Sequence, residues 1–277
     1  MKTFQDNYKN ECPKSGIRQK YFQHSIFKTL TDIKEFYEGL SGNDESSTIL
    51  AIKGYINVNW DIFASISNTV DSIITLLERG RVNDSIALMR KFNDAVIMSV
   101  YLLIMIEKGE KNFLEIDYAS LYDNVLNQWV RGEANLIEKK DNEDKMEAYM
   151  TVIRERDYKL YDLLFSKQNK KVFGQGRSSF NDNIHYNKLD SFLWNNDAFL
   201  DYDTCISVLN EAENTIKLIS AIHFAYVALI RPMALKAEDY SSSVAPFVDD
   251  FFQQYIVPKY STLADYLKQC SFLTFDE

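Results

Sequence analysis

Apolar residues recur at intervals of three and four along most of the chain, a spacing that predicts amphipathic helices rather than strands. The first predicted helix covers residues 19–40, and the second covers residues 60–77. Gly80 interrupts the apolar stripe of the second helix, and Asn83 or Asp84 can cap a third helix that follows. We expect the second and third helices to form an antiparallel hairpin at the centre of the fold.

Two helices carry stretches that are apolar on all sides, at residues 95–106 of the third helix and at residues 218–230. The second of these stretches ends a long predicted helix, 203–230, which Asp203 can cap and which must stop before Pro232. Helices that are apolar all round are buried, and both stretches are well short of the ~20 residues that cross a bilayer. We therefore expect central buried helices and no membrane span.

Further helices complete the pattern. The third helix ends near residue 107, and others are predicted at residues 120–131, 143–165, 248–256 and 260–269. The charge of residues 143–165 is interpreted as a solvated face, and residues 48–59 fit either a strand or a helix start and are left unassigned. Nine glycines and four prolines are too few for a sandwich or a barrel. The prediction is an all-α multi-helix bundle, one helical domain over residues 1–277 in which residues 1–18 form a loosely ordered arm.

The net charge, the cysteines and the missing motifs argue against several classes of function. The net charge of −9 argues against bulk coating of nucleic acid, although a local basic groove stays open. Three widely spaced cysteines form no CxxC pair and the N-terminus lacks an apolar signal segment, so a reducing, cytoplasmic setting is expected. Three histidines show no metal-binding spacing, and nucleotide-binding and GxSxG motifs are absent. We expect neither a metal nor a cofactor.

The candidate site is the polar segment 177–187, where Arg177, Asn181 and His185 follow one another at four-residue spacing. If this segment is helical, each step advances about 40° around the axis, so the three side chains share one side. The apolar neighbours would then face the core; they are Phe180, Ile184 and Leu189. A cation, an amide and an imidazole would converge on one small ligand.

Such a trio suits RNA cleavage without a metal. His185 would exchange a proton with the ribose 2′-hydroxyl or the leaving oxygen, and Arg177 would stabilise the phosphate. Asn181 would orient the histidine or a phosphate oxygen. The residues expected to attract the RNA backbone are Lys167, Lys170 and Lys171. The structural alternative is that Asn181 and Asp182 cap or cross-link helices, that His185 is a hydrogen-bonded packing residue, and that the lysines form a solvated loop.

A second polar group lies in the third helix. Arg90 and Asp94 can pair at i,i+4, which is interpreted as a structural ion pair, with support of His185 from a facing helix as the functional alternative. His223, on an apolar helix, is interpreted as a hydrogen-bonded core histidine.

Four stretches resemble, in order, a family of bacterial helical proteins that in turn is similar to the HEPN superfamily; they are NWDIFASISNTVDSII (59–74), GRVNDSIALMRKFNDAVI (80–97), FNDNIHYN (180–187) and VAPFVDDFF (244–252). The resemblance implies a dimeric, metal-independent ribonuclease of a toxin–antitoxin or antiphage system, with an antitoxin or another defence protein as partner.

The motif of that superfamily is an Arg followed, after four to six residues, by a His. Here seven residues separate Arg177 from His185, and Ser178 stands beside the Arg. The residues that fit the resemblance better than the Arg are Asn181, Asp182, Tyr186 and Asn187. Two expectations follow: a HEPN-like endoribonuclease, or a non-catalytic interaction or regulatory subunit of a defence complex, for which the 17 Tyr and 18 Phe would supply many exposed aromatic side chains.

Overall fold

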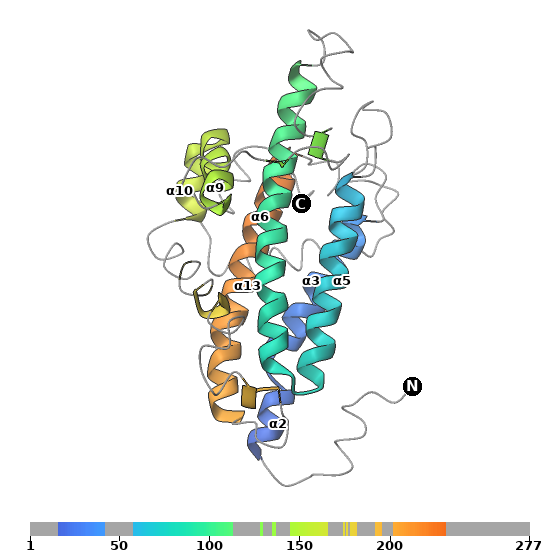
Figure 1. Cartoon of the computed structure of the whole chain (residues 1–277), viewed down its shortest axis with the longest axis vertical. Helices are drawn as coiled ribbons and strands as arrows, with labels where there is room; N and C mark the ends of the chain where they lie inside the picture. Colours follow the sequence, from blue (N-terminus) through green and yellow to red (C-terminus); the bar gives the residue numbers. More distant parts are fainter. Residues whose placement is uncertain are drawn as a thin grey trace, which may run out of the picture. The chain divides into compact units, whose positions relative to one another are not determined.

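The computed structural model describes residues 16–41, 58–112, 128–129, 135–136, 145–165, 174, 176, 178–181, 192–195 and 202–230. Its helices are α2 (Gly16–Phe22), α3 (Ser25–Ser41), α5 (Val58–Glu78), α6 (Val82–Asn112), α9 (Lys145–Arg156), α10 (Tyr158–Leu164) and α13 (Tyr202–Ile230) (Figure 1). The described residues contain no strand, which confirms the predicted all-α multi-helix class.

Several predictions fall partly or wholly outside this part of the chain. The helices at 248–256 and 260–269 lie outside the described residues, and of 120–131 only residues 128–129 are described, both helical. Of the expected arm, only the last three residues are described, and they open α2. Of the unassigned 48–59, residues 58–59 begin α5.

Contacts divide the chain into two units. Unit 1 comprises residues 1–35, 65–93 and 167–220, and unit 2 comprises residues 36–64, 94–166 and 221–277. Four helices, α3, α5, α6 and α13, each contribute one segment to each unit. Whether the chain forms one domain, and whether α5 and α6 form its centre, stay predictions.

The core of unit 1 joins α2, α3, α5 and α13. Ile26, Leu30 and Leu209 are fully buried, at the apolar positions that the period of three and four indicates. The Tyr21 hydroxyl is also buried and donates to the carbonyl of Leu77 at 2.9 Å, which fastens α2 to the last turn of α5.

The core of unit 2 is rich in aromatic rings. The rings of Phe36 and Phe224 lie 5.9 Å apart, and a second cluster around Tyr101 and Leu102 includes the partly buried Trp129. The predicted burial of both apolar stretches is confirmed, since the α6 segment around 96–104 is almost entirely buried and α13 is buried throughout 218–227, across the boundary between the two units at residue 220. Within the described residues, no helix is both long and apolar enough to span a bilayer.

Two helices predicted as continuous are broken. The first, 19–40, is interrupted after Phe22, where the Nδ1 atom of His24 accepts a hydrogen bond from the backbone N–H of Ile26 at 3.1 Å. The charged helix 143–165 is interrupted at Asp157, whose extended backbone and side-chain bond from the Leu160 N–H form an N-cap. In both places a side chain competes for backbone donors, without a proline or glycine to announce the break.

The start of α6 also differs from the prediction. Val82 is the first residue of α6, so Asn83 and Asp84 lie inside its first turn and do not cap it. Instead, the Val82 N–H donates to the Trp194 carbonyl at 2.9 Å, and the Asp84 N–H donates to the Asn195 side chain at 3.1 Å. In the same way Asp203 lies inside α13, which begins at Tyr202.

The charged helix pair α9 and α10 is solvated only in part. Tyr158 is exposed, but Arg156 reaches the α6 residue Glu107 with two hydrogen bonds, one of them from Nη2 to Oε1 at 2.7 Å. The solvated-face interpretation was therefore wrong for Arg156, because its side chain joins two helices of unit 2.

Candidate functional site

The segment that precedes and opens the candidate site is helical where it is described, at residues 174, 176 and 178–181. Gly176 and Phe180, one helical turn apart, are buried, and Phe180 keeps only 2% of its surface exposed. Ser178 and Asn181 are exposed. The segment therefore has one buried face and one face open to solvent, as predicted for Phe180.

Gly176 packs directly against α13. A Cβ atom built on Gly176 would lie 2.1 Å from Thr215 Oγ1 and 2.9 Å from Thr215 Cβ, far inside normal contact distances. Thr215 itself is 1% exposed. Only a residue without a side chain fits here, so the segment approaches α13 more closely than any other residue would allow.

Of the predicted site residues, the described ones are Asn181, Arg90 and Asp94. The residues that lie outside the described part are Arg177, Asp182, His185, Tyr186, Asn187, Lys167, Lys170 and Lys171. Asn181 is helical and exposed, so its side chain can reach a ligand from solvent. That the side chains of Arg177 and His185 lie on the same side as Asn181 stays a prediction.

Arg90 and Asp94 lie one turn apart in α6, and both are half-buried. Both side chains have interaction partners, so neither is an isolated buried charge. Their support of His185 from a facing helix stays a prediction, because that histidine is outside the described residues.

His223 is a hydrogen-bonded core histidine, as interpreted from its apolar helix. It is fully buried between the Tyr37 hydroxyl, 2.6 Å from Nδ1, and the Ser99 hydroxyl, 3.0 Å from Nε2. Burial lowers the pKa of His223 to about 3 and raises the pKa of Tyr37 above its ordinary value. The ring is neutral at physiological pH and reaches no solvent, so it cannot serve as a general acid or base for an external substrate.

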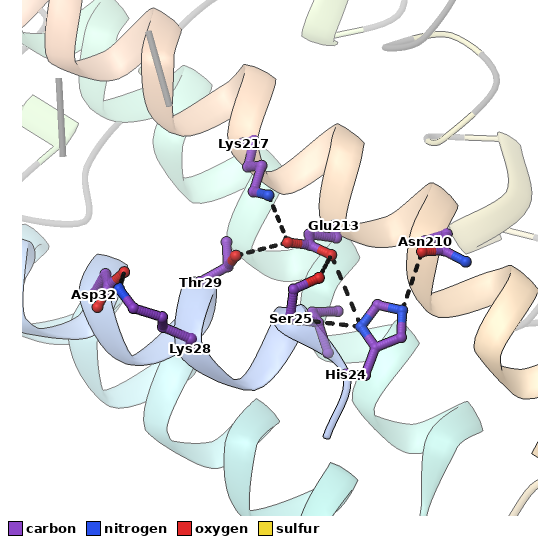
Figure 2. A network of polar contacts seen from close by, with 9 residues as sticks. His24, Ser25, Lys28, Thr29, Asp32, Asn210, Glu213 and Lys217 are labelled. Carbon is purple, nitrogen blue, oxygen red and sulfur yellow. Dashed lines mark hydrogen bonds and ion pairs between the residues drawn. The ribbon is translucent and has the colours of Figure 1, made fainter. Parts of the chain in front are cut away.

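A polar network that sequence reasoning missed joins α3 to α13 in unit 1 (Figure 2). At its centre is the carboxylate of Glu213, a residue only 4% exposed. One carboxylate oxygen accepts from Ser25 Oγ at 2.6 Å, and the other accepts from Thr29 Oγ1 at 2.8 Å. Lys217 Nζ lies 2.5 Å from the second oxygen, so the buried charge is both paired and hydrogen-bonded.

His24 stands at the edge of this network. Its Nδ1 accepts from the Ile26 N–H, which places the remaining proton on Nε2, and Nε2 is 3.1 Å from the Asn210 side-chain oxygen. Nδ1 is 3.8 Å from the Glu213 carboxylate. Both ring nitrogens are engaged and the Ser25 proton points at a carboxylate, so the network holds two helices together and offers no activated nucleophile.

The Glu213 carboxylate is held ionised. Burial alone would raise its pKa, but the hydrogen bonds from Lys217, Ser25 and Thr29 and the charge of Lys217 outweigh burial and bring the pKa below its ordinary value of 4.5. A sequence signal existed for this network: Asn210, Glu213 and Lys217 lie on one side of the predicted helix 203–230.

The network and the candidate segment are on opposite sides of α13. Residues of a helix are spaced by about 100°, so Thr215, which contacts Gly176, points about 160° away from both Lys217 and Glu213, each two positions along the helix. His24 therefore belongs to the α3 side of α13 and cannot complete a site with Asn181.

The described residues contain no group of three or more His, Cys, Asp and Glu side chains placed to share a metal ion. Comparisons with protein-family models, with curated proteins and with solved structures find no match to this chain.

Proposed function

We propose that this protein is a HEPN-like, metal-independent endoribonuclease that cuts single-stranded RNA in a bacterial antiphage or toxin system. Its active site is the solvent-facing side of segment 177–187, with His185, Arg177 and Asn181 as the residues that touch the substrate. The observation that supports this proposal is the two-sided character of the described part. Gly176 and Phe180 are buried, and Asn181 is exposed.

The proposed chemistry needs one proton carrier and one anion stabiliser. The ribose 2′-oxygen attacks the adjacent phosphorus and loses its proton, the bond from phosphorus to the 5′-oxygen breaks, and that oxygen takes up a proton. His185 carries one of these protons, because an imidazole titrates near neutrality. Arg177 stabilises the charge on the phosphate with its forked donors, and Asn181 orients the histidine or a phosphate oxygen.

The substrate and partners follow from the same proposal. Lys167, Lys170 and Lys171 precede the site in the sequence and attract the RNA backbone within an otherwise acidic chain. Two copies of the chain form a homodimer, and an antitoxin or another defence protein restrains the nuclease in the cytoplasm.

The test is cleavage of a labelled single-stranded RNA in the presence of a chelator. We expect the wild-type protein to cleave, and His185→Ala to lower the rate by roughly 10²- to 10⁴-fold, the usual contribution of a general acid or base. Asn181→Ala lowers the rate less. The matched control is Asn214→Ala, which removes an exposed asparagine of α13 and leaves the rate unchanged.

Equal cleavage by the wild type and His185→Ala, or cleavage by neither, would refute the nuclease. The second outcome, together with a protein partner that copurifies, would favour the alternative of a non-catalytic regulatory subunit. That alternative gains no support from exposed aromatic surface, since the large apolar side chains exposed among the described residues are Tyr158 and Phe192. Single exposed aromatic residues are common on monomeric proteins.

A further inference from the structure

We propose that Gly176 is a positioning residue of the candidate site, because its missing side chain lets the segment dock on α13 at Thr215 and so fixes the direction in which Asn181 points. The proposal rests on the proposed ribonuclease function. It concerns Gly176, a residue outside the trio that touches the RNA.

The contact leaves no room for even one methyl group. A Cβ on Gly176 would lie 2.1 Å from Thr215 Oγ1, 2.7 Å from Cγ2 and 2.9 Å from Cβ. Threonine is stiff about its first side-chain torsion, and a rotation would only exchange one branch atom for another. The Thr215 Cβ atom cannot move without the backbone of α13. Any side chain at position 176 must therefore push the segment away from α13.

Such a displacement reaches the proposed site through Phe180. Phe180 lies one turn after Gly176 on the same buried face, and Asn181 follows it directly. If the segment moves outward or rotates at Gly176, Phe180 leaves its packed position and Asn181 changes its direction. A misplacement of about 1 Å in catalytic groups can lower a rate by about 100-fold.

Gly174 provides a matched control two residues earlier. A Cβ on Gly174 meets no atom within 4 Å, and both glycines have an ordinary backbone φ, so an alanine is compatible with the backbone at either position. We expect Gly174→Ala to leave the melting temperature and the cleavage rate unchanged. We expect Gly176→Ala to lower the melting temperature by roughly 5 °C, as overpacking does. At a temperature where it is fully folded, its kcat falls on the order of 100-fold, with KM little changed.

Rescue by Thr215→Ala distinguishes positioning from simple loss of stability. This substitution removes the two closest contact atoms and leaves only the Thr215 Cβ contact of 2.9 Å, so the double variant Gly176→Ala/Thr215→Ala regains part of the kcat and of the melting temperature lost by Gly176→Ala. Equal effects of alanine at positions 174 and 176, or strictly additive effects in the double variant, would overturn the docking contact.

Two further outcomes separate this proposal from the proposed function. A Gly176→Ala protein that is less stable but cleaves normally would overturn the positioning role and leave the nuclease intact. An inactive wild-type protein would refute the nuclease and the positioning role together, and the melting temperatures would still decide whether Gly176 docks on Thr215.

Discussion

Glu213 shows how a single buried charge can join two helices. A carboxylate removed from water is costly unless donors surround it, and Glu213 has hydroxyl donors from two residues of α3 and an ammonium donor from its own helix. Hydrogen bonds to charged groups contribute more to stability than those between neutral groups, about 1.5–3 kcal/mol for each bond. The residue therefore stabilises unit 1 only while it is ionised.

This gives a pH-dependent prediction. The pKa of Glu213 is lower in the folded protein than its ordinary value of 4.5. The stability that the ionised carboxylate contributes is therefore present above about pH 5 and is lost as the pH falls through the folded-state pKa. At pH 7, Glu213→Gln should be less stable than the wild type by about 2 kcal/mol in urea unfolding. The difference should shrink steadily below pH 4.5. A constant difference from pH 7 to pH 3 would contradict an ionised Glu213.

At the scale of residues, the sequence predicted burial better than it predicted polar partners. Phe180 and His223 were expected to be buried because apolar neighbours at helical spacing surround them, and both are buried. His24 and its partner Asn210, like Glu213 and its α3 partners Ser25 and Thr29, are separated by 184 to 188 residues in the chain. Such pairs depend on which faces of two helices meet, and the spacing within either helix does not specify that.

At the scale of helices, ends announced by glycine or proline were predicted, and ends formed by side chains were missed. Gly80 was expected to interrupt a helix, and α5 ends at Glu78 with Gly80 at a φ of 68°. The start of α6 is capped instead by the Trp194 backbone carbonyl and the Asn195 side-chain oxygen, more than 100 residues away. No local pattern could reveal that cap, because it is created by the folded chain.

Gly80 allows a direct test of the turn between α5 and α6. The Gly80 N–H donates to the Leu77 carbonyl and the Arg81 N–H donates to the Leu76 carbonyl, at 2.9 Å each, which is the pairing of a Schellman motif with glycine in the left-handed conformation. Gly80→Ala should destabilise the protein by about 1–2 kcal/mol, the cost of that conformation for a residue with a Cβ.

The control for this turn is Gly80→Asn, because asparagine tolerates the left-handed conformation better than alanine does. Chemical unfolding of both variants beside the wild type measures the difference. If alanine and asparagine are equally tolerated, the positive φ of Gly80 does not determine the stability of the turn.

At the scale of the whole molecule, the two units share their main helices. The unit boundaries cut α3 after Glu35, α5 after Ala64, α6 after Asn93 and α13 after Ser220. None of these points has a glycine, a proline or a break in the helix. To unfold one unit alone, the chain would have to end four helices in mid-course and expose backbone donors and acceptors at each cut.

We therefore expect the two units to unfold in one cooperative transition, and a substitution in unit 2 should weaken unit 1 equally. Cys205 is fully buried in unit 1, and Ile104 is fully buried in unit 2. In a background where Cys12 and Cys270 are serine, Ile104→Val should lower the free energy of unfolding by about 1 kcal/mol. The larger population of unfolded protein should then raise the rate at which a thiol reagent labels Cys205 about fivefold. Hydrogen exchange in the buried part of α6 should accelerate by the same factor. If exchange in unit 2 accelerates while Cys205 labelling stays at its wild-type rate, the units unfold independently, and the four shared helices do not couple them.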